Sequence, residues 1–264
     1  MGHRLYRQQE LSPEQLAGEL LNQPRTTARL LICQAARNDP EAQALLGQIL
    51  LDGQGIRQDA RLALSWFRMA ARQGHAMACN MAGRCLEHGW TGKSDPAAAA
   101  SYYRQAACCG LDWGFYNLAN LLATGHGVPR DEHRAFALYL KAAQMGHAKS
   151  MNLVGRYCEE GRASQPADRE TAARWYQRSA EAGDFRGQFS HACLLADRGD
   201  WSGARYWLEQ ALAGGHLKFL RRARDELLAA RWPALQDISQ AYVRRCQHLE
   251  QQGCPETASQ RVQI

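Results

Sequence analysis

The sequence predicts an all-helical protein built as a solenoid of stacked helical hairpins, and three observations support that prediction. Leu and Ala are abundant while Val and Ile are scarce, which favours helix because unbranched side chains lose little rotamer freedom there. Glycines that follow Ala-rich stretches recur 36, 36, 37 and 32 residues apart, at Gly74, Gly110, Gly146, Gly183 and Gly215. Other landmark residues recur with the same period, which is the signature of a repeat architecture.

The first half of each repeat predicts a helix that packs closely and then stops. A small residue stands within this helix, where it permits close approach of the paired helix at some cost in helix propensity: Gly47, Gly83, Ala119, Gly155 and Ala192. A glycine six residues later in four repeats is expected to end the helix: Gly53, Gly89, Gly125 and Gly161. Gly55 and Gly127 let the chain turn through positive φ in two of them.

The second half of each repeat predicts a capped helix with one apolar stripe. An aspartate precedes it and can cap its free N–H groups: Asp59, Asp95, Asp131 and Asp168. An alanine and an aromatic pair, or its remnant, then lie three and four residues apart on one face: Ala63 with Trp66-Phe67, Ala99 with Tyr102-Tyr103, Ala135 with Leu138-Tyr139, Ala172 with Trp175-Tyr176, and Ala204 with Trp207-Leu208. A single hairpin cannot bury this stripe alone, so stacking of neighbours completes the core.

The unit L-G-x-x-x-x-x-G-x-G-[IV]-x-x-D-x-x-x-A-x-x-W-F-x-x-A-A-x-x-G resembles the Sel1-like repeat, a relative of the tetratricopeptide repeat. Its best copies lie at 46–74 and 118–146, while the second and fourth copies depart in the turn and the fifth lacks the loop glycines. The resemblance covers about residues 39–216. It implies an α-solenoid wound as a right-handed superhelix, with five repeats at 39–74, 75–110, 111–146, 147–183 and 184–215.

The segments that flank the repeats are predicted to be helical caps with polar outer faces, which terminal repeats need for solubility. In the N-terminal cap, residues 1–38, Ser12-Pro13-Glu14-Gln15 predicts a helix start with both capping-box partners. A second helix over 25–37 is expected to lean on the first repeat. The C-terminal cap, residues 217–253, is predicted to hold helices over about 217–230 and 233–251. The tail, 254–264, is expected to be flexible.

Composition argues for a cytoplasmic protein without a nucleic-acid or membrane partner. The net charge of +6 comes from 32 basic and 26 acidic residues that are interspersed, whereas a nucleic-acid binder concentrates its basic residues on one face. The N-terminus has no apolar secretory segment, and no apolar run approaches 18 residues. The nine cysteines are odd in number and irregularly placed, as suits the reduced thiols of the cytosol.

Neither a catalytic site nor a metal or cofactor site is predicted. A zinc site could be imagined from one cluster with partly helix-compatible spacing: His75, Cys79, Cys85 and His88. Cys85, however, occupies the repeat position of Ile49 and Leu121, which predicts a core residue. A redox pair at Cys108-Cys109 is not expected, because adjacent cysteines on a helix point different ways. A nucleotide site is not expected at Gly125-His126-Gly127, because this segment lacks the Lys-Ser/Thr of a phosphate loop. We therefore expect no enzymatic activity.

Binding is expected in the concave groove that the first helices of successive repeats would line. Placing the repeats in the register of tetratricopeptide repeats, by analogy, assigns these partner-binding residues to the groove: Asn80, Arg84, Trp113, Tyr116, Asn120, Lys149, Asn152, Arg156 and Phe189. Asparagine amides can pair with an extended backbone, arginine grips carboxylates, and aromatic residues anchor interfaces. The alternative is that the polar residues only solubilise the surface, while Tyr116 and Phe189 pack between helices.

These observations predict a non-enzymatic scaffold or adaptor that binds a protein or an extended peptide carrying acidic and hydrophobic side chains. The resemblance implies the same, because Sel1-like proteins are generally assembly or signalling adaptors. Two alternatives stay open: an RNA-binding helical-repeat protein and a dedicated regulatory subunit of an enzyme. The groove positions show no repeating code of side chains, which counts against RNA.

Overall fold

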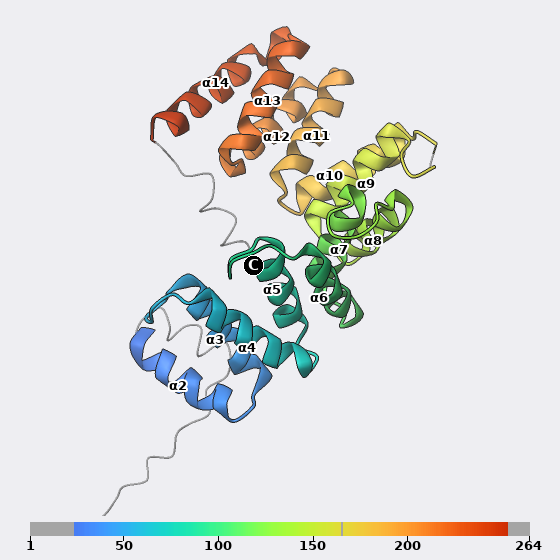
Figure 1. The fold of residues 1–264 in the computed structure, drawn as a ribbon. Coiled ribbons are helices and arrows are strands. Elements are labelled where there is room, and N and C mark those ends of the chain that lie inside the picture. The colour runs from blue at the N-terminus through green and yellow to red at the C-terminus, as the bar shows by residue number, and fades with distance from the viewer. Residues whose placement is uncertain (1–23, 165, 253–264) are drawn as a thin grey trace, which may run out of the picture. The chain divides into compact units, whose positions relative to one another are not determined.

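The computed structural model describes residues 24–164 and 166–252, and every regular element in that part of the chain is a helix (Figure 1). In chain order these are α2 (Pro24–Ala36), α3 (Pro40–Asp52), α4 (Ala60–Arg72), α5 (Ala76–Glu87), α6 (Pro96–Cys108), α7 (Asp112–Thr124), α8 (Glu132–Gln144), α9 (Ala148–Glu160), α10 (Arg169–Glu181), α11 (Phe185–Asp197), α12 (Trp201–Gly214), α13 (Leu217–Ala230), the 3₁₀ helix η1 (Pro233–Leu235) and α14 (Gln236–Gln251). The helix start predicted at Ser12 and the predicted tail lie outside the described residues.

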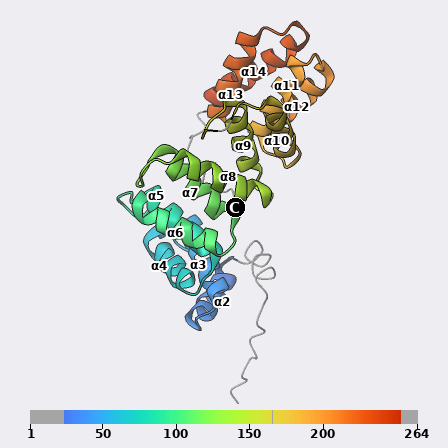
Figure 2. The same cartoon turned by 90° about the vertical axis from the view of Figure 1, so that its right-hand side faces the viewer.

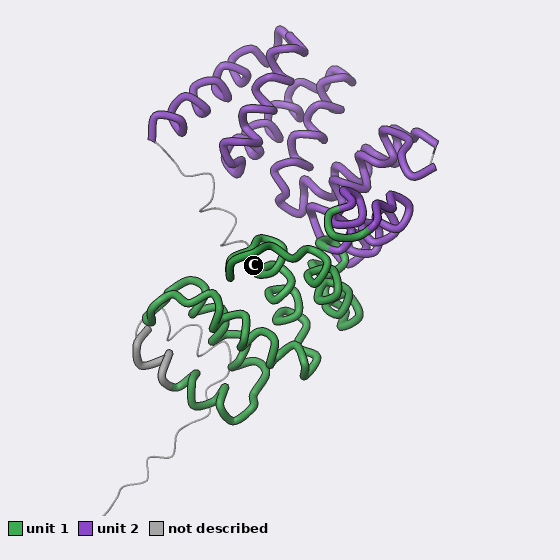
Figure 3. The backbone as a smooth tube through the Cα atoms, in the orientation of Figure 1, with its two compact units in different colours: residues 1–117, 126–128 green, residues 118–125, 129–264 purple. Residues whose placement is uncertain are grey.

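The chain divides into two compact units (Figure 3). Unit 1 comprises residues up to Asn117 together with His126–Val128, and unit 2 comprises Leu118–Gly125 and the residues from Pro129 onward. Within unit 1, α3 packs on α4 and α5 on α6. Within unit 2, α9 packs on α10, α11 on α12, and α13 on α14. The two views agree that these helices of unit 2 lie in adjacent pairs (Figure 2). The helical hairpins predicted from the period are confirmed, while the boundaries of the five repeats stay a proposal.

The predicted aspartate caps are confirmed at the starts of the second helices. Asp59 Oδ1 accepts from the backbone N–H of Leu62 at 2.9 Å, and Asp131 Oδ1 accepts from that of Arg134 at 2.9 Å. Asp95 and Asp168 cap α6 and α10 in the same way. Each side chain satisfies a donor that a helix start leaves without an intrahelical partner, so the sequence sets where these helices begin.

The small residues of the first helices lie against the aromatic rings of the second helices. A Cβ placed on Gly83 would lie 2.6 Å from Tyr103 Cε1, and one placed on Gly155 would lie 2.7 Å from Tyr176 Cδ1. Gly47 stands in the same relation to Phe67. Real Cβ atoms do not approach that closely, so glycine is needed for the ring to pack on the helix backbone.

Buried tyrosine hydroxyls in this layer each have an acceptor. Tyr103 donates to Glu87 Oε2 at 2.5 Å and Tyr176 to Glu159 Oε2 at 2.7 Å. In the third repeat, which has alanine at the position of these glutamates, Tyr139 donates to Asn120 Oδ1 at 2.7 Å. Where the ring position carries no hydroxyl, the glutamate position is apolar too: Phe67 goes with Leu51, and Leu208 with Ala196. The pairing follows from the cost of burying an unsatisfied hydroxyl.

The last two helices pack as one more hairpin on the end of unit 2. The predicted helix over 217–230 is α13, and the one predicted over 233–251 begins as η1 and continues as α14. Leu220, Leu227 and Tyr242 are buried in one apolar core with Phe189 of α11. The Tyr242 hydroxyl also donates to the Leu208 carbonyl oxygen at 2.8 Å. The row of first helices in unit 2 therefore continues past the fifth repeat, onto α13.

Candidate binding pocket

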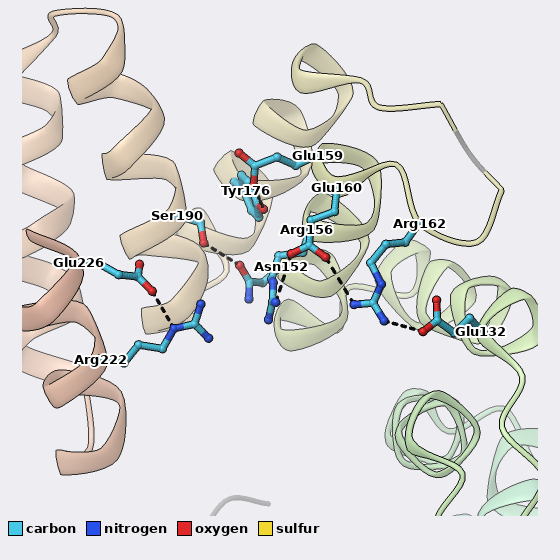
Figure 4. Close-up of polar contacts among 10 residues, drawn as sticks. All are labelled: Glu132, Asn152, Arg156, Glu159, Glu160, Arg162, Tyr176, Ser190, Arg222 and Glu226. Carbon is cyan, nitrogen blue, oxygen red and sulfur yellow. Dashed lines mark hydrogen bonds and ion pairs between the residues drawn. The ribbon is translucent and has the colours of Figure 1, made fainter. Parts of the chain in front are cut away.

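A pocket of about 440 Å³ opens in unit 2 among the first helices α9, α11 and α13. Asn152 and Arg156 of α9 lie on one side, and Arg222 of α13 lies on the other (Figure 4). Phe189 of α11 and Phe219 of α13 contribute apolar surface, and their ring centroids are 5.8 Å apart. The pocket thus combines hydrogen-bond donors, the three guanidinium groups of Arg156, Arg186 and Arg222, and an aromatic surface.

Three parallel helices build this pocket, because each first helix is separated from the next by one antiparallel helix of a hairpin. Ser190 Oγ of α11 donates to Asn152 Oδ1 of α9 at 3.2 Å. Arg186, in the first turn of α11, lies 3.2 Å from Nε2 of His216, the residue that caps α13. Both contacts join residues at similar positions along neighbouring first helices, and this holds the helices in register.

Asn152 is a largely buried polar residue that lines the pocket. Only 4% of the residue is exposed, and its side-chain carbonyl oxygen accepts from Ser190. Its Nδ2 atom makes no hydrogen bond to any described residue and keeps access to solvent. Asn152 therefore offers this donor to a ligand.

Arg156 and Arg222 each form an ion pair with a glutamate four residues later on the same helix. Arg156 Nη2 lies 3.3 Å from Glu160 Oε1, and Arg222 Nε lies 2.7 Å from Glu226 Oε1 (Figure 4). All four residues line the pocket. Pairs at this spacing are exposed and weak, so an incoming anion can compete for the guanidinium groups.

A network of ion pairs holds Glu160, and through it Arg156. Arg162 bridges Glu160, at 3.5 Å, and Glu132, at 2.9 Å, while Arg130 also pairs with Glu132. Hydrogen bonds first from Arg162 and then from Arg130 lower the pKa of Glu132 to about 2. The Arg162 guanidinium lies 4.4 Å from the centroid of the Tyr157 ring, which fixes it against the core.

The structure brings three of the nine predicted binding residues into the pocket: Asn152, Arg156 and Phe189. Phe189 is also largely buried and packs against Phe219. It therefore both lines the pocket and packs between helices, the two roles that the sequence allowed. Asn120 accepts from Tyr139 and serves the core. Lys149 lies near the pocket's N-terminal end without lining it, and its charge acts on buried Asp184.

The other four predicted residues belong to unit 1. Asn80 is 3% exposed and accepts from Asn117 Nδ2 at 2.8 Å. The Arg84 guanidinium lies 5.4 Å from the centroid of the Trp90 ring. Trp113 and Tyr116 pack edge to face with centroids 5.8 Å apart.

Sequence reasoning missed the α13 side of the pocket, because it ended the groove at the fifth repeat. The signal was present in the sequence: an arginine followed four residues later by a glutamate occurs at 156–160 and again at 222–226. Reasoning from the sequence also missed the helix-capping role of histidine. Nδ1 of His75 accepts from the backbone N–H of Ala78 at 3.0 Å, and His147 and His216 cap α9 and α13 alike.

The residues of the imagined zinc cluster serve the fold in other ways. His75 uses Nδ1 to cap α5, while its Nε2 lies 3.1 Å from Glu41 Oε2. Burial raises the pKa of the Cys79 thiol to about 11 and that of Cys85 to about 12, which disfavours the thiolate that a metal requires. Within residues 24–164 and 166–252, no three His, Cys, Asp or Glu side chains are grouped to hold a metal ion. In the same ranges, no helix is both long and apolar enough to cross a membrane.

The family model for the Sel1 repeat matches residues 40–75, 76–111, 116–147, 148–184 and 202–216. Chitin synthase regulatory factor 3 of Schizosaccharomyces pombe is 25% identical over 185 residues, which are 54% of this chain and 20% of that protein. A chitin synthase regulator of Saccharomyces cerevisiae is 29% identical over 131 residues, 48% of this chain and 19% of that protein. The chain spans about a fifth of the length of these two relatives.

Two solved structures share the fold. A Sel1 repeat protein from Oxalobacter formigenes superposes with a TM-score of 0.75 at 23% identity, over 89% of this chain and 97% of that one. A protective antigen of uropathogenic Escherichia coli gives 0.69 at 21% identity, over 90% of this chain and 54% of that one. The family match extends over more than half of the chain and coincides with the capped hairpins described above. The chain therefore belongs to the Sel1 repeat family.

Proposed function

We propose that this chain is a non-enzymatic adaptor that binds another protein through an extended segment laid along its first helices. The observation that carries the proposal is the pocket of unit 2, where Asn152, Arg156 and Phe189 meet. Asn152 supplies an amide donor for a peptide backbone, Arg156 a group for an acidic side chain, and Phe189 an apolar surface. Stacked helical repeats use their first-helix surface for binding in this way.

The charge state of the pocket supports binding rather than catalysis. Arg156 and Arg222 are paired with glutamates on their own helices, and Glu159 accepts from Tyr176. The cysteines of the described residues are all free thiols, which supports the cytoplasmic location that we propose.

A narrower form of the proposal is a regulatory subunit whose partner is an enzyme. The two fungal relatives are named as regulators of chitin synthase, and this favours a regulatory role for the shared repeats. The class of enzyme is not carried over, because the chain spans only about a fifth of those proteins.

Capture from an extract of the producing cells tests the proposal. Arg156→Glu is compared with wild type and with Arg174→Glu, a matched variant whose arginine pairs with Glu170 four residues earlier on α10, outside the pocket. A protein captured by wild type and by Arg174→Glu but lost from Arg156→Glu, with all three equally helical by circular dichroism, is the expected result. Equal recovery by all three would contradict a binding role for the pocket.

The same capture experiment decides the RNA alternative. Recovery of nucleic acid alone, with a yield that falls steeply between 50 and 200 mM salt, would favour RNA over a protein partner, since phosphate contacts release counterions. Arg84→Glu in α5 then shows whether the binding surface extends over unit 1, because its partners Met81 and Trp90 are local to that unit.

A further inference from the structure

The charged residues that line the pocket are sorted by sign along the three parallel helices. Counted within each helix, the basic side chains occupy positions two to nine: Arg186, Lys218, Arg222 and Arg156. The acidic side chains occupy positions ten to thirteen: Glu226, Glu159, Glu160 and Asp197. Because the helices run in parallel, one end of the pocket is positive and the other negative.

Helix stability does not explain this order. Acidic residues stabilise the first turn of a helix and basic residues the last, whereas the pocket places them the other way round. The macrodipoles of α9, α11 and α13 add to the same field, positive at the N-terminal ends and negative at the C-terminal ends. The charges therefore strengthen the helix dipoles along the pocket.

The pKa values of two side chains that line the pocket reflect the charges at its two ends. Burial is the largest cause of the lowered pKa of His216 at the N-terminal end, and the charges of Arg186, Lys218 and Lys149 lower it further. The pKa of the Cys193 thiol is raised to about 12, first by burial and then by the acidic groups of Glu226, Asp197 and Glu159. His216 therefore lies near basic groups and Cys193 near acidic ones.

Ion pairs within the chain satisfy part of this charge. Arg156 and Arg222 pair with glutamates of the other end, and Asp197 pairs with Arg169 of α10 at 3.3 Å. Lys218, however, is exposed and forms no ion pair or hydrogen bond among the described residues. The Nδ2 atom of Asn152, at position five of α9 and so within the basic stretch, also makes no hydrogen bond there and keeps access to solvent. Both groups are therefore open to a ligand.

We propose that the pocket binds a partner segment whose charges are sorted in the complementary order. An acidic side chain would lie over the N-terminal ends of α11 and α13, an apolar one on Phe189 and Phe219, and a basic one over the helix C-terminal ends. This inference rests on the proposed adaptor function and names the chemistry of its partner.

The dimensions of the pocket set the length of the segment. Arg186 and Asp197 are eleven residues apart on α11, which is about 16 Å along a helix axis at about 1.5 Å per residue. An extended chain advances about 3.3 Å per residue, so about five residues separate the outermost charges. The amide of Asn152, at position five of α9, then donates to a carbonyl oxygen in the acidic half of the segment.

Two fluorescent hexapeptides of identical composition and zero net charge test the inference by anisotropy with the full chain. The sorted peptide is acetyl-Asp-Asp-Leu-Phe-Lys-Lys-amide, and the alternating peptide is acetyl-Asp-Lys-Leu-Phe-Asp-Lys-amide. The sorted peptide is expected to bind about fivefold more tightly, because several partly exposed charge contacts, each weak by itself, act together. The preference should shrink as NaCl rises from 50 to 500 mM.

A charge swap on the pocket wall provides the decisive variant. R222E/E226R keeps the net charge and the pairing at four residues, and places glutamate before arginine, an order that favours a helix. It inverts the charge order on α13, so the preference for the sorted peptide should be lost. The control swap E170R/R174E exchanges an exposed pair on α10 outside the pocket and should keep it. Should R222E/E226R be unfolded by circular dichroism, Lys218→Glu tests the positive end alone.

Equal affinity of wild type for the two peptides, a preference that survives R222E/E226R, or no binding of either peptide would overturn the sorted-charge inference. None of these results decides the proposed function, which depends on whether Arg156→Glu loses a captured protein. A captured protein lost from Arg156→Glu, together with indifference to peptide charge order, would therefore leave the adaptor role standing without the sorted pocket.

Discussion

The same pair of residues, an asparagine and an arginine one helical turn later, is used differently in the two units. In unit 1, Asn80 accepts from the amide of Asn117, and Arg84 lies over the Trp90 ring. In unit 2, Asn152 accepts from the shorter hydroxyl of Ser190, and Arg156 pairs with Glu160.

The difference comes from the neighbours of the pair. The residue four after the arginine is His88, which follows the end of α5, in unit 1 and Glu160, the last residue of α9, in unit 2. The residue that reaches the asparagine from the next first helix is an amide in unit 1 and a serine in unit 2. A repeat position therefore determines where a side chain lies, while its surroundings determine what that side chain can bind.

The largest expected effect tests whether the cores of the two units are equivalent. Gly83→Ala in unit 1 and Gly155→Ala in unit 2 place a Cβ within 2.7 Å of a buried tyrosine ring. We expect each to lower the free energy of unfolding by about 1–3 kcal/mol, measured by urea denaturation. Gly214→Ala is the control, because a Cβ there has only one contact, at 3.6 Å, and should leave stability unchanged or slightly raised. Unequal losses at Gly83 and Gly155 would show that the two cores differ.

Removing one tyrosine hydroxyl from each unit separates stability from binding. Tyr103→Phe and Tyr176→Phe each remove a hydrogen bond to a glutamate, at a cost of about 1–2 kcal/mol in unfolding free energy. Of these two pairs, only Tyr176 and its acceptor Glu159 line the pocket. Tyr176→Phe should therefore also change the affinity for the sorted peptide, whereas Tyr103→Phe should not. An equal change in affinity for both variants would contradict the assignment of binding to unit 2.

Exchanging the side chain that donates to each asparagine makes the surroundings of Asn152 resemble those of Asn80, or the reverse. Ser190→Asn gives unit 2 the amide that unit 1 has at Asn117, and the larger side chain occupies part of the pocket. We expect peptide affinity to fall severalfold while stability changes by no more than about 0.5 kcal/mol. Asn117→Ser is the reciprocal change in unit 1 and should leave peptide affinity as in wild type. Unchanged affinity in Ser190→Asn would place the binding groups elsewhere.

The smallest expected effect concerns the network of ion pairs in unit 2 that holds Arg156 through Glu160. Arg162 is the first cause of the low pKa of Glu132, which falls from 4.5 to about 2. A lowered carboxyl pKa contributes stability that is present above pH 4.5 and is lost as the pH falls through about 2. In Arg162→Ala the pKa of Glu132 should rise toward its ordinary value, which an NMR titration measures. The stability difference from wild type should be constant above pH 4.5 and shrink below it. A difference that stayed constant down to pH 2 would rule out Glu132 as its source.

Local rules made much of the fold predictable from the sequence. Helix starts followed from single side chains, as at Asp59 and Asp131, because a cap acts on N–H groups only two or three residues away. Gly53 ends α3 with φ of 74°, a conformation that glycine adopts without strain. The close approach at Gly83 and Gly155 also followed from the repeat, because equivalent positions meet equivalent rings.

The candidate site was predictable only in part. Asn152 and Arg156 were found because the repeat places them on the first-helix face, but so were Asn80 and Arg84, and the sequence could not separate the two pairs. Arg222 was missed, since α13 lies beyond the repeats that the pattern identified. Whether a polar side chain is enclosed, paired or open depends on helices more than thirty residues away along the chain.

The sequence by itself determined the period of the helices, their caps and the apolar stripe that requires stacking, because these depend on contacts within one hairpin. The tertiary structure alone decided that the Asn152 amide oxygen accepts from Ser190 and that Arg222 lies across the pocket from Asn152. It also decided the sorting of charge along the pocket, which exists only because three parallel helices bring their corresponding ends together. The sequence settles contacts local in the chain, and the structure is needed for those that join one hairpin to the next.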